Sequence, residues 1–137
     1  MTSVLVVDDA PATRAILSEV LTLEGYSVQT AEHGGPALEI MRASHEHLLI
    51  TLGLMMPVVD GWAVLEAVAA DGALAQRHAI IMVTGSVGAA AKGPVAALRE
   101  QLGVPLVAKP FTVAQLLDAL EEAERGWTLR FGDARDR

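Results

Sequence analysis

The chain has 137 residues, of which 52% are apolar and 4% aromatic, and it carries a net charge of −7. This length fits one domain with an aliphatic core, and the absence of cysteine excludes disulfides, thiol catalysis and thiolate metal sites. The acidic balance disfavours direct binding to nucleic acid or to an anionic membrane, because both require patches of Lys and Arg.

The first half of the chain alternates short apolar runs with amphipathic segments of helical length. Residues 4–7 predict a strand rich in β-branched side chains, and residues 11–24 predict a helix with one apolar stripe. Residues 27–30 predict a weaker strand at the edge of a sheet, and residues 36–44 predict a helix that opens with a proline. Residues 48–52 form a continuous apolar run, which is typical of a strand buried on both faces.

The second half repeats this alternation after a turn at Asp60-Gly61. Apolar spacing predicts a helix face at residues 64–68 and a buried strand at residues 80–83. The Gly/Ala-rich stretch 85–93 is interpreted as a mobile connection. The remaining predicted elements are a helix face at 95–102, a last strand at 104–108 and a helix that begins after the N-cap residue Thr112.

These segments read as five strand–helix units, which predict a parallel sheet covered by helices on both faces. We expect one α/β domain, residues 1–125, followed by a C-terminal tail, residues 126–137, without an internal repeat. Residues 1–7 contain no basic residue, so they do not resemble a secretory signal. The longest apolar stretch is too short to span a bilayer, and we therefore expect a soluble, cytoplasmic protein.

In such sheets the ligand site lies beyond the carboxyl ends of the strands. The predicted strand ends carry Asp8 and Asp9, Gly53, Thr84 and Lys109. Two carboxylates, a hydroxyl and an ammonium group are therefore expected to converge on one edge of the sheet.

Four motifs resemble, in order and spacing, the response-regulator receiver family of two-component phosphorelay signalling. They are LVVDD at residues 5–9, LMMPVVDGW at 54–62, Thr84 at a strand end and AKPF at 108–111. The resemblance covers about residues 2–125. It implies a flavodoxin-like sheet, as in chemotaxis regulators, with strand order 2-1-3-4-5 and five helices.

The resemblance also implies roles for the strand-end residues. A receiver takes a phosphoryl group from a histidine kinase onto an aspartate at the end of the third strand. By position, Asp8, Asp9 and the backbone carbonyl of Met55 would hold Mg²⁺. Thr84 and Lys109 would neutralise charge on the phosphoryl group. The Lys109-Pro110 peptide bond would be cis, as is usual in the family.

Two positions depart from the family pattern. The phosphoacceptor position, four residues before Pro57, is Gly53, which has no nucleophile, and Leu106 stands where the family has a switch aromatic. Thr51 is expected to point to the other face or to lie deeper in the strand. We therefore expect no phosphorylation at position 53 and weak or absent binding of Mg²⁺.

The predicted function is signalling by protein–protein contact rather than enzymatic catalysis. The partners would be a sensor histidine kinase or phosphotransfer protein, a downstream output protein, or both, and the sequence leaves a homodimer open. One hypothesis is an active receiver whose aspartate has been replaced; the alternative is a degenerate receiver regulated without phosphorylation. A nucleotide-binding enzyme of the same fold is disfavoured, because residues 8–11 contain no glycine-rich phosphate loop.

Several other polar and aromatic residues are candidates for a structural role instead of a functional one. His45 and His47 are expected to be solvated loop residues rather than a metal pair, because no third ligand lies nearby in the sequence. Trp127 and Phe131 either form a partner surface or pack back on the domain. Asp60 is interpreted as a turn residue and not as a replacement phosphoacceptor.

Overall fold

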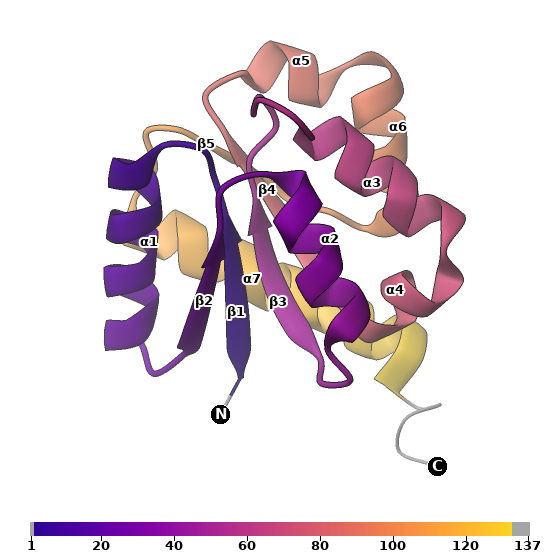
Figure 1. Ribbon diagram of the computed structural model, residues 1–137, viewed down its shortest axis with the longest axis horizontal. Helices are drawn as coiled ribbons and strands as arrows, with labels where there is room; N and C mark the ends of the chain where they lie inside the picture. Colours follow the sequence, from indigo (N-terminus) through magenta and orange to yellow (C-terminus); the bar gives the residue numbers. More distant parts are fainter. Residues whose placement is uncertain (1, 133–137) are drawn as a thin grey trace.

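The chain folds around a five-stranded parallel sheet in the order β2-β1-β3-β4-β5, as seen in a computed structural model that describes residues 2–132 (Figure 1). This confirms the predicted strand order. The strands are β1 (Ser3–Val7), β2 (Ser27–Ala31), β3 (Leu48–Leu52), β4 (Ala79–Thr84) and β5 (Leu106–Ala108).

Helices cover both faces of the sheet. One face is covered by α1 (Pro11–Leu23) and α7 (Val113–Trp127), which continues into a π-helical turn, η1 (Thr128–Gly132). The other face is covered by α2 (Gly34–Ala43), α3 (Gly61–Ala70), α4 (Gly72–Arg77), α5 (Val87–Ala91) and α6 (Gly93–Leu102).

Residues 2–132 thus form seven α-helices, whereas five were predicted, and the two additional helices are short. Helix α4 has Asp71 as its N-cap, and the carboxylate of this residue accepts a hydrogen bond from the Ala73 N–H. Helix α5 lies in the stretch that was interpreted as a mobile connection, and it buries Ala90 completely. Helices of five or six residues are too short for apolar periodicity to show them.

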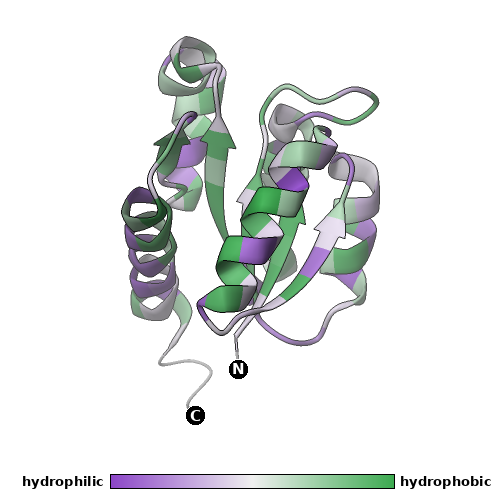
Figure 2. Ribbon diagram, turned by 90° about the vertical axis from the view of Figure 1, so that its left-hand side faces the viewer, coloured by the Kyte–Doolittle hydropathy of each residue, from purple (hydrophilic) through white to green (hydrophobic). Residues whose placement is uncertain are grey.

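The two sides of the sheet bury separate clusters of aliphatic side chains. All five residues of β3 are buried, with Leu48, Ile50 and Leu52 facing the layer of α2 and α3. Leu49 belongs to the cluster beneath α1 and α7. Figure 2 shows hydrophobic residues concentrated on the central strands. The continuous apolar run therefore reflects burial on both faces, as its pattern predicted.

The last helix is fixed at its start and extends past the predicted end of the domain. Thr112 and Gln115 form a reciprocal capping box, which confirms the predicted N-cap. Helix α7 and η1 carry the chain beyond residue 125, so the boundary between domain and tail stays a prediction. Residues 133–137 of the predicted tail lie outside the described residues. Within residues 2–132, no helix is long and apolar enough to cross a membrane.

Val58, in the loop between β3 and α3, has a left-handed backbone with φ of +69°, and the residue is 86% exposed. This conformation costs an L-residue about 1–2 kcal/mol, and a β-branched residue is rarely found there. Val58→Gly should raise the free energy of unfolding by about 0.5–1 kcal/mol, because the relieved strain exceeds the added entropy of the unfolded chain.

Urea denaturation followed by circular dichroism measures this difference. The matched control is Val113→Gly, at an exposed position in the first turn of α7, which should lower the free energy of unfolding. A Val58→Gly variant no more stable than the unmodified chain would contradict the prediction.

Candidate functional site

The carboxyl ends of four strands meet at one edge of the sheet. Asp8 follows β1, Gly53 follows β3, Thr84 ends β4 and Lys109 follows β5. Backbone hydrogen bonds extend the ladder past the strand ends: the Gly53 N–H donates to the Val7 carbonyl at 2.9 Å, and the Lys109 N–H donates to the Thr84 carbonyl at 3.0 Å. The geometry therefore brings these four predicted residues together.

A buried carboxylate and a lysine form the central contact of this edge. Lys109 Nζ lies 2.6 Å from Asp8 Oδ2, and Asp8 is only 3% exposed. The second carboxylate oxygen, Asp8 Oδ1, accepts a hydrogen bond from the Ala10 N–H at 2.9 Å. A charge-assisted bond of this length is among the stronger polar contacts in proteins, so the Asp8 charge is neutralised internally.

Arg14 also contacts this residue, and the sequence reasoning missed it. Its Nη1 donates to the backbone carbonyl of Asp8 at 2.7 Å, and its Nη2 lies 4.0 Å from Glu32 Oε1. The available signal was an arginine placed at the start of the helix that follows the two aspartates. The guanidinium ties this end of β1 to α1.

The other two proposed metal ligands are exposed, in contrast to Asp8. Asp9 is exposed, and the residue Met55 is 65% exposed. Among residues 2–132, no group of three or more His, Asp or Glu side chains is arranged to hold a metal ion. Because the buried carboxylate of Asp8 is already paired with Lys109, the residues present fit a divalent cation poorly. The assignment of Asp8, Asp9 and Met55 as ligands remains a proposal.

Thr84 is buried, at 4% exposure, and its hydroxyl oxygen accepts a hydrogen bond from the Ser86 N–H at 2.9 Å. The hydroxyl is therefore held at the strand end by the loop that follows. Leu106, at the start of β5, is half-buried and pairs with Met82 of β4. The Lys109-Pro110 peptide bond is cis, as the resemblance implied.

The structure requires glycine at one of two glycine positions at this edge but not at the other. A Cβ at Gly61 would clash with the Gly53 carbonyl oxygen, so the close approach of α3 to the end of β3 requires glycine there. A Cβ at Gly53 would lie 3.5 Å from each of its nearest neighbours, which are Asp8 Oδ2, Met56 Sδ and the Val7 carbonyl oxygen. That is ordinary van der Waals contact, so the backbone does not require glycine at position 53.

Other side chains near Gly53 do not replace the missing nucleophile. Thr51 is 1% exposed and lies deeper in β3. Asp60 caps α3, since its Oδ1 accepts a hydrogen bond from the Ala63 N–H at 2.9 Å. Asp60, which was interpreted as a turn residue, is thus the N-cap of α3.

Away from this edge, one histidine differs from the prediction. His45 is exposed, but the interpretation of His47 as a solvated loop residue was wrong, because its side chain is 14% exposed and bonded at both ring nitrogens. Trp127 stacks on it, with ring centroids 3.7 Å apart. Of the two open alternatives for Trp127, packing on the domain is therefore the one found. The contacts join residues up to 80 positions apart, so no local pattern could reveal them.

Residues 4–121 match the family described as the response regulator receiver domain. The probable chemotaxis protein CheY of Rhizobium etli is 34% identical over 122 residues, which cover 86% of this chain and 88% of that protein. The probable transcriptional regulator ycf27 of Porphyra purpurea is 44% identical over 63 residues, 46% of this chain. That match spans only 26%, about a quarter, of the ycf27 protein.

Solved structures show the same architecture. Vibrio cholerae chemotaxis protein CheY4 is 28% identical with a TM-score of 0.71, over 90% of this chain and 98% of that chain. The response regulator TrrA of Thermotoga maritima, solved in complex with Mg²⁺ and BeF, is 27% identical with a TM-score of 0.73. Its match covers 90% of this chain and 99% of that chain.

Lys109→Met should lower the free energy of unfolding by about 2 kcal/mol, because the buried Asp8 carboxylate loses its charged partner. Adding Asp8→Asn should recover part of this loss, since the neutral amide no longer needs a counter-ion. Urea denaturation of the two single variants and the double variant measures the coupling. Lys92→Met, at an exposed lysine, is the control. Strictly additive losses would argue against a stabilising ion pair.

Proposed function

Because the chain belongs to the response regulator receiver family, we propose that it signals through protein–protein contact and is not phosphorylated at position 53. The observation that carries this proposal is the ion pair of Asp8 and Lys109 beside Gly53. We assign Gly53 to the phosphoacceptor position. A glycine offers no oxygen for an acyl phosphate, and its neighbours at the strand end supply no replacement.

The contact between the charges at this edge supports a module that stays in one conformation without phosphorylation. Thr84 and Lys109 are the groups that we assign to phosphoryl recognition, yet Lys109 contacts the Asp8 carboxylate at 2.6 Å. Without an acceptor carboxylate, Asp8 supplies the negative charge that balances the ammonium group. The proposed module therefore needs neither a metal ion nor a phosphate to neutralise its site.

The proposed partners are those of the family: a sensor histidine kinase or phosphotransfer protein, an output protein, or both, in the cytoplasm. The chain spans about a quarter of the ycf27 relatives, so their activity as whole proteins is not transferred. Direct binding of nucleic acid is not proposed for this acidic chain.

Two origins of Gly53 are considered: loss of the acceptor alone, and a degenerate receiver. Each is favoured by a specific observation. The space for a Cβ at position 53 and the retained Asp8, Thr84 and Lys109 favour a site that lost only its acceptor. Leu106, in place of the switch aromatic, favours a degenerate receiver that no longer uses phosphorylation. Reinstating the aspartate separates the two.

The unmodified chain should take up no phosphate at position 53 when incubated with acetyl phosphate and Mg²⁺. It should also bind Mg²⁺ weakly, because Lys109 is paired with the Asp8 carboxylate and position 53 supplies no carboxylate. Intact-mass measurement and titration with Mg²⁺ test the two statements. A stoichiometric phosphate adduct on any other residue, or micromolar affinity for Mg²⁺, would show that the module is still a phosphoacceptor or metal site.

Gly53→Asp should accept one phosphoryl group from acetyl phosphate and should bind Mg²⁺ more tightly than the unmodified chain. The reason is that the strand ends hold the other charged groups in place and leave ordinary contact distance for the new Cβ. We expect the chemistry to return more fully than the conformational response, because Leu106 cannot repeat the movement of an aromatic ring.

Gly53→Asn is the matched control, since its amide has the same shape but cannot form an acyl phosphate. Mass spectrometry reports the adduct, and amide chemical shifts report folding and conformational change. A folded Gly53→Asp variant that takes up no phosphate would favour the degenerate receiver over loss of the acceptor alone.

A further inference from the structure

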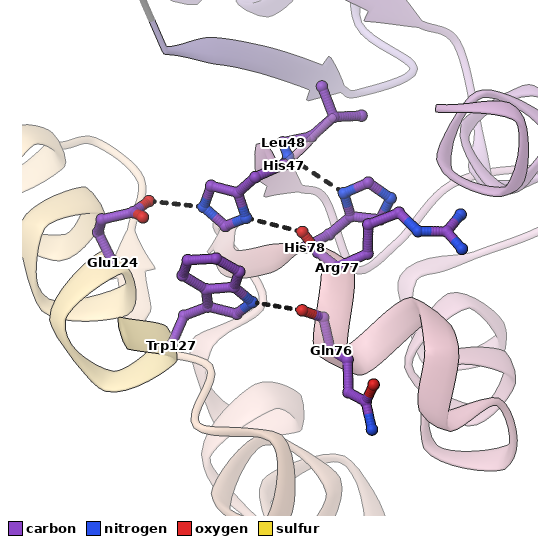
Figure 3. A network of polar contacts seen from close by, with 7 residues as sticks. All are labelled: His47, Leu48, Gln76, Arg77, His78, Glu124 and Trp127. Atoms are coloured by element: carbon purple, nitrogen blue, oxygen red, sulfur yellow. Dashed lines mark hydrogen bonds and ion pairs between the residues drawn. The ribbon is translucent and has the colours of Figure 1, made fainter. Parts of the chain in front are cut away.

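A polar network ties three distant segments together at the amino-terminal edge of the sheet, opposite the strand ends described above (Figure 3). His47 directly precedes β3, Arg77 ends α4, and Glu124 and Trp127 lie in the last turns of α7. The imidazole of His47 stacks on the indole of Trp127 with 26° between the rings.

Both ring nitrogens of His47 face oxygen atoms that accept hydrogen bonds. Nδ1 lies 2.7 Å from the backbone carbonyl oxygen of Arg77, and Nε2 lies 2.8 Å from Glu124 Oε2. A carbonyl and a carboxylate cannot donate, so both contacts are hydrogen bonds only if the ring carries both protons. A neutral imidazole would satisfy one contact and would turn a lone pair toward the oxygen of the other.

A carboxylate and an aromatic face both lie against the ring of His47. Burial, followed by the charges of Glu121, Glu124 and Glu24, raises the pKa of Tyr26, so two carboxylates of α7 act on the same neighbourhood. The face of Trp127 also favours a cation stacked upon it.

Ionisable groups on the neighbouring segments have other partners or lie in solvent. The guanidinium of Arg77 donates to the backbone carbonyls of Arg42 and Ser44. The ring of His78 accepts from the Leu48 N–H through Nδ1, and its Nε2 lies 2.8 Å from the Met41 carbonyl oxygen. That pattern fits a neutral ring. His45 and Glu46, on the same loop as His47, are exposed.

The network also caps the end of a helix. The last carbonyl groups of an α-helix have no donor within the helix. In α4, the Gln76 carbonyl accepts from Trp127 Nε1 at 3.0 Å, and the Arg77 carbonyl accepts from His47. Side chains from two other segments therefore supply hydrogen-bond donors to the last carbonyl groups of α4. Beside them lies a cavity of about 60 Å³, whose lining includes His78, Trp127 and Phe131.

We propose that His47 is a proton-controlled clamp on the C-terminal end of α7. With both ring nitrogens protonated, it joins Glu124 and Trp127 to the end of α4. When the ring loses one proton, one of the two contacts becomes a lone pair facing an acceptor, and the end of α7 is released together with η1. The clamp is closed at lower pH and opens as the pH rises, independently of Gly53.

NMR of the labelled full chain between pH 5 and 8.5 tests this clamp. The indole N–H signal of Trp127 and the ring nitrogens of His47 should pass through the same one-proton transition. Trp62, the second tryptophan of the chain, is the internal reference. His47→Gln should abolish the transition at Trp127, whereas His45→Gln, at the exposed neighbouring histidine, should leave it unchanged.

Glu124→Gln provides a second variant in case His47→Gln does not fold. Its transition should move to lower pH, because the imidazolium loses its anionic partner. The proposal is overturned if the Trp127 signal is independent of pH or if the transition persists in His47→Gln. It is also overturned if His47 retains an unprotonated ring nitrogen at the lowest pH. None of these outcomes depends on phosphorylation, so they leave the proposed function untouched.

Discussion

The ion pair of Asp8 and Lys109 joins the ends of two strands that are not neighbours in the sheet, since β3 and β4 lie between β1 and β5. Its carboxylate is buried, so removing either charge alone leaves the other uncompensated. Arg14 and Ala10 complete the hydrogen bonds of Asp8, while the backbone of Lys109 continues the ladder from Thr84. At this edge of the sheet, opposite charges that follow the first and last strands contact each other directly.

Much of this architecture could be predicted, because each strand carries its signal locally. The apolar run of β3 indicated burial on both faces, and the strand order followed from the family resemblance. Helices α4 and α5 were missed because their formation depends on a single cap at Asp71 and on tertiary burial of Ala90. Neither effect produces a periodic pattern in five or six residues.

The position of the candidate site could be predicted from the sequence, but its long-range side-chain contacts could not. Parallel strands place their carboxyl ends on one edge, so the convergence of Asp8, Thr84 and Lys109 follows from topology. The bond from Arg14 depends on the direction of a long side chain, which the sequence does not specify. The environment of His47 depends on Glu124, 77 positions away, and for that reason a loop histidine was interpreted as solvated.

The different constraints on Gly53 and Gly61 also make the site a place to install new chemistry. Position 61 is fixed by the backbone, whereas position 53 tolerates a Cβ at ordinary contact distance from Asp8. Because the chain contains no cysteine, a thiol introduced at position 53 would be unique. Position 53 is buried, so the first atom of that side chain would lie against Asp8 and Met56. The rate at which a small reagent modifies this thiol would thus report how often the end of β3 opens to solvent.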